Sequence, residues 1–319
     1  MPLSRGSCLI NYDLCSSRFL WYCQHSVGGW KIQRKVHRST STCKMSTEKN
    51  YFGSSPEYIL KHRTQYPSSR TIVVSGATAG IGLAIANHLL SSSDQHLLIL
   101  AGRKVDVLND FQSTNPDRVI TRAGDMADLG FVQSMLRGVQ CDGRLDALAL
   151  NHGTLGKCLR IGQMEGDEWD RTFRINVTSC VVLIKETLPL LRSAKGRIIF
   201  TSSGAATNAY PSWGVYGATK AAINHLAMTL KNEEPDVTTV SIRPGVVDTA
   251  MQMDIREKFL HNMDEKDQQK FLSAKSDGKL LPPEKPGNVI AELAVKAKKE
   301  LSGLFLSWDD PQLAEYQVE

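Results

Sequence analysis

The sequence predicts one doubly wound α/β domain with a seven-stranded, mainly parallel sheet. From residue 70 onward, short runs of Val, Ile and Leu alternate with segments of helical periodicity. Strands this apolar are typical of a parallel sheet that is covered by helices on both faces. The first strand is followed at once by "SGATAGIG" and then by a helix. Since no break in the alternation marks a second domain, residues 70–319 are predicted to form a single unit.

Seven apolar segments justify the strands. The first, "TIVVS", is rich in β-branched residues, and the others are apolar runs of similar length, from "HLLILA" to "GLFLSW". In chain order they cover residues 71–75, 96–101, 118–123, 145–151, 196–203, 237–244 and 303–308.

The segments between them carry apolar residues at helical spacing. In the run that contains Tyr216, for example, Ile223, Leu226 and Leu230 recur on one face. The predicted helices cover Ile81–Leu90, 107–112, 127–138, Glu168–Leu191, the Tyr216 run, and 287–299.

Composition excludes several classes of protein. The chain of 319 residues is 41% hydrophobic and 22% charged, as in globular proteins, and no apolar run approaches the ~20 residues of a membrane span. The chain has 38 Lys and Arg residues, of which seven lie in the first 44 residues, and 33 Asp and Glu residues, of which one lies there. The rest therefore has 31 basic and 32 acidic residues, and neither a nucleic-acid partner nor a membrane is predicted.

Residues 1–44 are predicted to be a disordered basic extension, and residues 45–69 a variable lead-in. The extension is basic, Ser-rich and poor in acids, which is typical of a mitochondrial transit peptide. The alternative is an upstream extension of the reading frame with Met45 as the working start, favoured because "CSSRFLWYCQH" makes a poor amphipathic helix. The first interpretation predicts a mitochondrial protein and the second a cytoplasmic one.

The cysteines indicate a reducing compartment. The chain has seven, four of them in the first 44 residues, and it lacks C-x-x-C and H-E-x-x-H motifs. An odd number of widely spaced thiols is typical of an intracellular protein without disulfides. No metal site is predicted.

The turn after the first strand predicts a dinucleotide site. Gly76, Gly80 and Gly82 permit a tight turn, so that the backbone can approach a pyrophosphate at the start of a helix. Tight packing alone would also explain the glycines. Because this turn opens a βαβ series, we favour the dinucleotide, with Ser75 and Ile81 as further members of the site.

The end of the second strand indicates which dinucleotide binds. NAD enzymes normally place a carboxylate there to bind the ribose 2′-hydroxyl, whereas this chain has Arg103 and Lys104. Two cations suit a 2′-phosphate, so NADPH is the predicted cofactor. The alternative is that both side chains only solvate the start of a helix.

A tyrosine and a lysine lie four residues apart in "YGATK". Tyr216 and Lys220 therefore share one helix face, one turn apart. They could form a surface pair without consequence, or they could be a proton donor and the cation that lowers its pKa.

Over roughly residues 70–308, the chain resembles the short-chain dehydrogenases/reductases, because several motifs occur in the order found in that family. The motifs are "SGATAGIG", Asp125 after the third strand, "LNHG", "INVTS", "FTSSGA", Y-G-A-T-K and "RPGVVDT". The fold implied is the Rossmann fold. Residues 202–257 most resemble fungal benzil reductases and sepiapterin-reductase-like enzymes, through "SSGAATNAYPSWGVYGATKAAINHLAM" and "PGVVDTAMQMDIRE".

The resemblance implies a role for each motif residue. Tyr216 would be the general acid that protonates the carbonyl oxygen, and Lys220 would hold the nicotinamide ribose and lower the tyrosine pKa. Ser203 would hydrogen-bond the substrate carbonyl, and Asn176 would interrupt its helix to hold a water that relays protons to Lys220. The remaining implied cofactor contacts are Asp125, Asn151 and Gly153 on the adenosine side and Pro244, Gly245, Val247 and Thr249 at the nicotinamide.

Some positions depart from the family pattern. Ser75 keeps the hydroxyl of the usual Thr, whereas Leu150 and His152 replace Asn and Ala, so that packing between the central strands should differ. Ala79 stands where some NADP-preferring members have a basic residue. Ser307 aligns with the acid that grips the pterin in sepiapterin reductases, which makes a pterin substrate doubtful.

Residues 250–285 form the predicted substrate loop. Met251, Met253, Ile255, Phe259 and Leu260 give it an amphipathic start. It is either a lid over the active site or a pair of surface helices. As a lid it would, together with Trp213 and Tyr210, favour an aromatic or hydrophobic ketone.

The predicted function is an NADPH-dependent carbonyl reductase that transfers hydride to a ketone or 1,2-diketone such as benzil. The alternatives are a pterin or other small-metabolite reductase of the same mechanism, and a non-catalytic dinucleotide sensor. The sensor is disfavoured because such members usually lack the tyrosine or the lysine. Family members usually dimerise through the helices of Asn176 and Tyr216, so a homodimer is expected from the resemblance.

Overall fold

The computed structural model describes residues 20–26, 29–35, 56–137 and 144–318. The chain divides into two units, residues 1–48 and 49–319. In the first, β1 (Leu20–Ser26) and β2 (Gly29–Lys35) pair in antiparallel fashion. From the sequence, this extension is predicted to be disordered and to contain no strands.

The second unit is built on a seven-stranded sheet in the order β5-β4-β3-β6-β7-β8-β9, and every neighbouring pair is parallel. The chain enters at the centre, runs outward to β5, and returns to β6 to build the other half. The predicted doubly wound α/β class is therefore confirmed. The strands are β3 (Thr71–Ser75), β4 (Leu97–Gly102), β5 (Val119–Ala123), β6 (Ala147–Leu150), β7 (Arg197–Thr201), β8 (Thr238–Arg243) and β9 (Leu304–Ser307).

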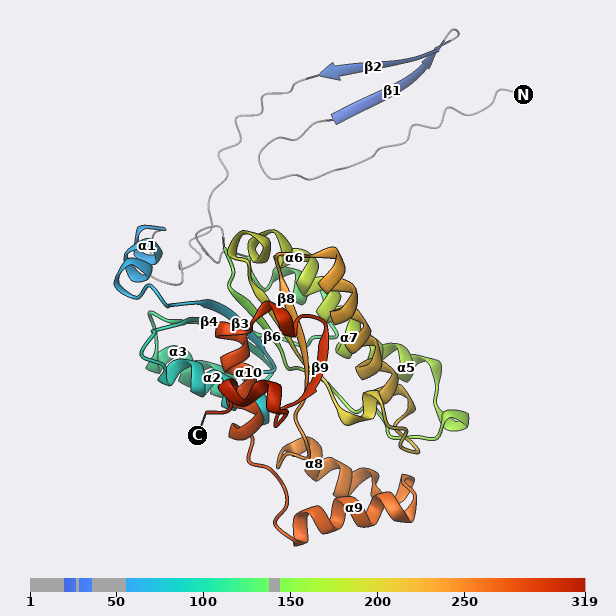
Figure 1. The fold of residues 1–319 in the computed structure, drawn as a ribbon. Coiled ribbons are helices and arrows are strands. Elements are labelled where there is room, and N and C mark those ends of the chain that lie inside the picture. Colours follow the sequence, from blue (N-terminus) through green and yellow to red (C-terminus); the bar gives the residue numbers. More distant parts are fainter. Residues whose placement is uncertain (1–19, 27–28, 36–55, 138–143, 319) are drawn as a thin grey trace, which may run out of the picture. The chain divides into compact units, whose positions relative to one another are not determined.

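Helices cover both faces of this sheet (Figure 1). Helices α2, α3 and α10 pack on one face, and α4, α6 and α7 pack on the other. The helices are α1 (Pro56–Gln65), α2 (Gly80–Ser91), α3 (Val105–Thr114), α4 (Leu129–Ser134), α5 (Gly166–Phe173), α6 (Ser179–Ala194), α7 (Gly214–Glu233), α8 (Ala250–Asp254), α9 (Glu265–Ser276) and α10 (Glu284–Lys296).

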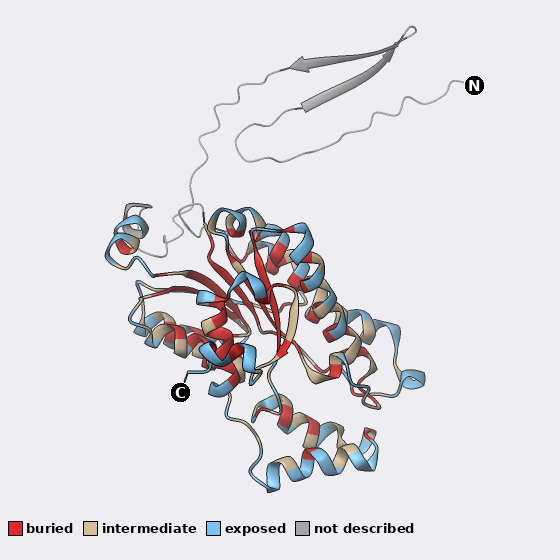
Figure 2. Cartoon of the chain, viewed as in Figure 1, coloured by how far each residue is buried: buried red, intermediate tan, exposed pale blue. Residues whose placement is uncertain are grey.

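Alternation along the strands divides the core into two layers. Ile72 and Val74 of β3 face the α2, α3 and α10 layer, whereas Val73 between them faces the other. All three are fully buried, and Figure 2 shows the strands as a buried slab between half-exposed helices. Burial on both faces explains why the strands are continuous apolar runs instead of alternating ones.

The helices differ from prediction in three places. The predicted helix Glu168–Leu191 contains a π-helical turn, Arg174–Thr178, between α5 and α6. Helix α4 is shorter than the predicted 127–138, because the Asp128 side chain caps it by accepting from the amides of Gly130 and Phe131, at 2.9 and 3.2 Å. Helix α10 starts at Glu284 and accommodates Pro286 in its first turn, where no helical N–H is lost.

The predicted substrate loop contains α8, a π-helical turn (Ile255–Phe259) and α9. These elements lie together at one end of the sheet, beyond the carboxyl ends of the strands (Figure 1). Within the described part of the chain, no helix combines the length and apolar character that crossing a bilayer requires.

Candidate active site

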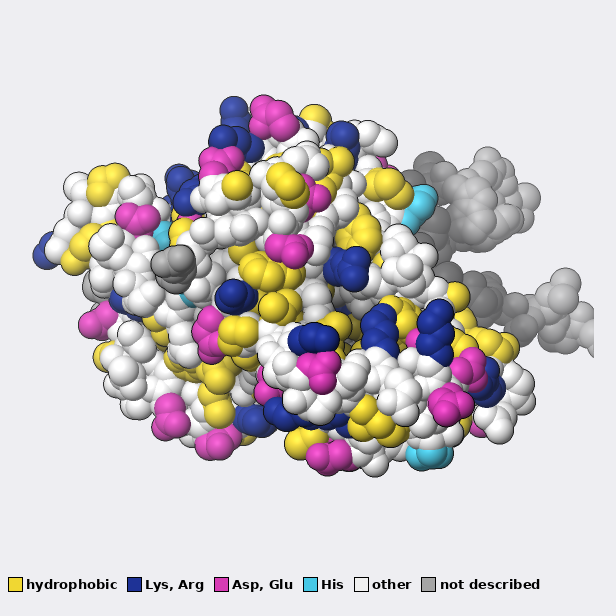
Figure 3. All heavy atoms as spheres, turned by 60° about the horizontal axis from the view of Figure 1, so that its bottom comes forward, with side chains coloured by type: hydrophobic (Ala, Val, Ile, Leu, Met, Phe, Trp, Pro, Cys, Tyr) yellow, Lys and Arg dark blue, Asp and Glu magenta, His cyan; other side chains and the backbone are white. Residues whose placement is uncertain are grey.

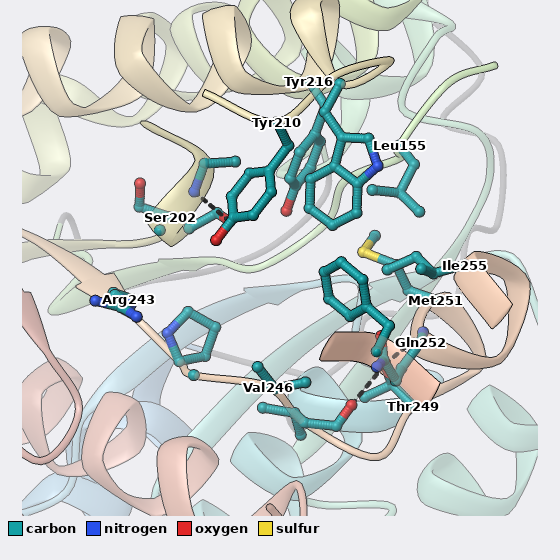
Figure 4. A pocket seen from close by; sticks show the side chains of 18 of the residues that line it. Leu155, Ser202, Tyr210, Tyr216, Arg243, Val246, Thr249, Met251, Gln252 and Ile255 are labelled. Carbon is teal, nitrogen blue, oxygen red and sulfur yellow. Dashed lines mark hydrogen bonds between the residues drawn. The ribbon is translucent and has the colours of Figure 1, made fainter. Parts of the chain in front are cut away.

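A cavity of about 180 Å³ opens where the carboxyl ends of β7 and β8 face the segment α8–α9. Parallel strands end at the same edge of a sheet, so residues distant in sequence meet there. Figure 4 shows Tyr216 and Tyr210 on one side, Thr249, Gln252 and Ile255 across from them, and Arg243 at another edge. Of the predicted site residues, the lining includes Ile81, Ser203, Tyr216, Pro244, Gly245, Val247 and Thr249.

Tyr216 and Lys220 lie on the inner face of α7, one turn apart. Both are buried, and the Lys220 ammonium is 5.8 Å from the centre of the Tyr216 ring. Its Nζ donates a hydrogen bond of 2.8 Å to the Thr201 carbonyl at the end of β7. The Ser203 side chain lines the same cavity as the Tyr216 ring. The structure therefore places the serine and the phenol at one cavity and the ammonium beside the phenol ring.

The pKa of Tyr216 moves opposite to the predicted direction. Burial raises the pKa of Tyr216 above its ordinary 10, and the hydrogen bond from Ser203 opposes this only in part. Burial also lowers the pKa of Lys220 to about 8. The structure thus contradicts the predicted lowering of the Tyr216 pKa by Lys220. Loss of hydration destabilises the phenolate more than its neighbours stabilise it.

Asn176 lies in the π-helical turn and is fully buried. Its Oδ1 accepts from the Thr154 amide at 2.8 Å, and its Nδ2 donates to the Thr154 carbonyl at 2.8 Å and to Thr219 Oγ1 at 3.0 Å. A Cβ at Gly153 would be 3.5 Å from both Asn176 Oδ1 and Lys220 Nζ. The turn thus fixes the amide beside the lysine, and π turns of this kind are frequent at functional sites.

The glycine turn after β3 fits a pyrophosphate. Gly76 and Gly80 have φ of +70° and +51°, which favour glycine, and a Cβ at Gly82 would lie 2.1 Å from the Gly76 carbonyl oxygen. No side chain caps the N-terminus of α2, where Ala79 is the exposed N-cap residue. The first amides of the helix can therefore serve an anion.

The residues predicted for the adenosine side lie outside the cavity. Arg103 and Lys104 follow β4 and are exposed, and among the described residues neither has a carboxylate partner. Asp125, after β5, accepts from the Ala127 amide at 2.9 Å and lies 3.6 Å from Arg171. The contact with Ala127 is a local turn contact, since the cap of α4 is Asp128.

The departures in "LNHG" have a structural explanation. The Nδ1 of His152 lies 2.7 Å from Ser75 Oγ, and its Nε2 lies 2.8 Å from Ser179 Oγ and 3.1 Å from the Ile175 carbonyl. Burial and the charge of Lys220 lower the His152 pKa to about 4, so the ring is neutral at pH 7. His152 thus braces β3 against α6, and Leu150 beside it packs in the core.

Asn151 supports the same strands. Its Oδ1 accepts from Thr201 Oγ1 at 3.1 Å, its backbone amide donates to Ser75 Oγ at 3.2 Å, and its Nδ2 lies 3.5 Å from the Gly76 carbonyl. This residue therefore connects the glycine turn to the end of β7.

The loop after β8 forms the floor of the cavity. Gly245 has a φ of +80°, and a Cβ there would lie 2.7 Å from Leu281. Val247 is buried and bridges to Leu281, and Thr249 is the N-cap of α8. Pro244, Gly245, Val247 and Thr249 are therefore held in one rigid turn beside the start of α2, where a Cβ at Gly80 would touch Thr249.

Aromatic residues form the opposite wall. Trp213 stacks on Phe271 of α9 at 5.3 Å between ring centres, meets Tyr210 at 5.1 Å, and meets Tyr216 edge-on at 5.7 Å. Phe271 is buried, although the sequence analysis did not identify it, because one aromatic residue in the charged stretch "DEKDQQKF" carries no periodic signal. Met253, expected on the pocket face, is 43% exposed.

Other lining residues were also missed by the sequence analysis. They are Leu155, Ser202, Gly204, Ala205, Arg243, Val246, Gln252 and Lys270. Five of them lie inside the motifs "FTSSGA" and "RPGVVDT", whereas Leu155, Gln252 and Lys270 lie outside both, and no periodicity marks any of the eight as facing a cavity. In the described residues, no group of three or more His, Cys, Asp or Glu side chains is arranged to hold a metal ion.

Comparison with known proteins agrees with this architecture. The family model for short chain dehydrogenases matches residues 70–259. An uncharacterized oxidoreductase of Schizosaccharomyces pombe is 34% identical, covering 76% of this chain and 97% of the relative. The benzil reductase ((S)-benzoin forming) of Saccharomyces cerevisiae is 34% identical, and the match covers 78% of this chain and 99% of the relative. A crystal structure of a Saccharomyces cerevisiae short chain dehydrogenase/reductase superposes with a TM-score of 0.75 at 31% identity. The match covers 78% of this chain and 100% of that one.

Proposed function

The chain belongs to the short-chain dehydrogenase/reductase family, and we propose that it is an NADPH-dependent carbonyl reductase acting on aromatic ketones and 1,2-diketones such as benzil. The family supplies the general activity, that of an oxidoreductase. The observation that carries the finer proposal is the shared cavity of Ser203 and Tyr216, walled by Trp213, Tyr210 and Phe271. The similarity to a benzil reductase over 78% of the chain supports the same substrate class.

In the proposed reaction the nicotinamide supplies hydride when it is bound. The residues of the chain bind and orient the carbonyl and supply the proton. Ser203 donates a hydrogen bond to the carbonyl oxygen, and Tyr216 donates its phenolic proton to the same oxygen. A raised tyrosine pKa keeps this proton in place at neutral pH, as a general acid in the direction of reduction requires. Lys220, held by the Thr201 carbonyl, would contact the ribose.

The aromatic wall supports the choice of substrate. Aromatic rings favour offset-stacked or edge-on partners at 4.5–7 Å, and the three rings already meet at such distances. A planar phenyl ketone would extend this stack while its carbonyl reaches Ser203 and Tyr216.

The first experiment follows NADPH oxidation with benzil in the parent protein and in Tyr216→Phe. The phenylalanine keeps the ring and its packing, so we expect unchanged folding and a loss of kcat of roughly 10²–10⁴-fold. Turnover of benzil that survives loss of the phenol would contradict the mechanism.

The second experiment tests the cofactor. Arg103 and Lys104 follow β4, and neither forms an ion pair with a carboxylate in the described part of the chain, which supports binding of a 2′-phosphate. In Arg103→Ala we expect the ratio of kcat/KM for NADPH over NADH to fall by about tenfold, the loss of one charge-assisted contact. The matched control is Lys285→Ala, which removes an exposed cation of α10. A preference for NADH in the parent protein would refute the assignment.

A further inference from the structure

The cavity has an unbalanced charge. Among the residues that the structure describes, its lining contains two cationic side chains, Arg243 and Lys270, and no aspartate or glutamate. Among the described residues, neither cation has a carboxylate partner within 4.0 Å, whereas Lys258 of the neighbouring segment is paired with Asp254 at 2.7 Å. The nearest acid of the loop after β8, Asp248, is paired with Lys275 at 3.1 Å.

Lys270 is held at the rim by the aromatic wall. Its Nζ donates to the Tyr210 hydroxyl at 2.8 Å and lies 4.7 Å from the centre of the Tyr210 ring. The next residue, Phe271, is buried against Trp213, which fixes this part of α9. One hydrogen bond leaves two of the three ammonium donors of the lysine available.

Arg243 is anchored at the end of β8. Its guanidinium lies over Gly204, where a Cβ would be 3.1 Å from Nε, so it lies close to the residue that follows Ser203. Figure 4 shows Arg243 across the pocket from Leu155 and Ile255. Seen from the side of α8 and α9, hydrophobic side chains surround a hollow, and both basic and acidic side chains lie around it (Figure 3).

An apolar cavity with unpaired cations at its edge is complementary to an apolar molecule with an anionic end. Guanidinium groups bind carboxylates through two parallel hydrogen bonds, and both cations are exposed at the edge of the cavity, where an anionic end could reach them. A neutral ketone would leave both charges unused. We propose that the substrate is an aromatic keto acid whose carboxylate is bound by Arg243 and Lys270 while its carbonyl meets Ser203 and Tyr216. This inference rests on the proposed carbonyl reductase activity and narrows its substrate class.

The experiment compares each keto acid with its own methyl ester. Phenylglyoxylate and 3-benzoylpropanoate place the carboxylate at two distances from the carbonyl. For at least one length, we expect kcat/KM of the acid to exceed that of the ester by about tenfold or more, and Arg243→Gln or Lys270→Gln to reduce this ratio about tenfold. Because acid and ester are measured on the same variant, a general loss of activity cancels. Lys266→Gln, another exposed lysine of α9, is the control.

A binding measurement makes the result independent of turnover. Calorimetry would compare the unreactive pair 4-phenylbutanoate and 4-phenylbutanol in the parent and in the double variant Arg243→Gln/Lys270→Gln. Tighter binding of the carboxylate in the parent alone supports the inference. Equal binding of the two ligands, or a preference for the acid that survives in the double variant, overturns it. If benzil and all keto acids fail to react while the carboxylate still binds selectively, the proposed reaction fails and the anion site stands.

Discussion

Replacing His152 with glutamine tests whether a neutral buried imidazole supports the centre of the fold. The ring lies between Ser75 and Ser179 with a pKa of about 4, below the ordinary 6.5. Between these values the unfolded chain binds a proton and the folded chain does not, so the free energy of unfolding falls as the pH falls. From pH 6.5 to 5.0 this loss is about 2 kcal/mol, at 1.36 kcal/mol for each pH unit.

The assay is urea unfolding of the parent and of His152→Gln at pH 7.5 and 5.0. At pH 7.5 the variant should be less stable by about 1–3 kcal/mol, because the serine hydroxyls lose a fitted partner. Between the two pH values, however, it should lose about 2 kcal/mol less than the parent does. His96, with a pKa of about 4 through burial, titrates in both proteins and cancels from the difference. His225→Gln, at an exposed position, is the control. Parallel pH curves for His152→Gln and the parent would refute the reasoning.

Three further substitutions probe the turn, the wall and the base of the sheet. Gly82→Ala places a Cβ 2.1 Å from the Gly76 carbonyl oxygen, so we expect about 1–3 kcal/mol of destabilisation by urea unfolding and weaker NADPH binding by fluorescence titration; unchanged affinity would show that the turn does not hold the cofactor. Phe271→Ala removes the buried ring that stacks on Trp213, so we expect the free energy of unfolding to fall by about 3–5 kcal/mol and the KM for benzil to rise. An unchanged KM would show that the aromatic wall does not contact the substrate. Asp146→Asn neutralises a carboxylate that is 1% exposed and surrounded by arginines. We expect the free energy of unfolding, measured in urea, to fall by about 3–5 kcal/mol. A fall below about 1 kcal/mol would mean that water solvates the arginines when the carboxylate is lost.

The strands and the order of the helices were predictable from local sequence. Each strand is a short run of Val, Ile and Leu that is buried on both faces, so composition alone identifies it, and the seven predicted segments correspond to β3–β9. Helix ends were less predictable. The π-helical turn at Arg174–Thr178 depends on Asn176 reaching Thr154 and Thr219, which are distant in sequence.

Part of the candidate site could also be predicted from local sequence. Tyr216 and Lys220 were identifiable because helical spacing places them one turn apart, and Gly76, Gly80 and Gly82 because a tight turn between strand and helix needs residues without side chains. Their proposed catalytic and binding roles stay predictions.

Other features could be seen only in the folded chain. The pKa of Tyr216 rises because the phenol is buried, and Trp213, which meets its ring edge-on, contributes to that burial. The resemblance had implied the opposite direction, because a sequence shows which charges are near along the helix and not how deeply the phenol is buried.

The sequence by itself determined the order of strands and helices, the glycine turn and the spacing of the tyrosine and lysine, because these depend on interactions between residues a few positions apart. The tertiary structure alone decided that Phe271 and Lys270 of α9 meet Tyr210, and that Arg243 faces the same cavity without an acidic partner among the described residues. Such contacts join loops from separate strand ends, and no periodicity in the chain records which of those loops become neighbours.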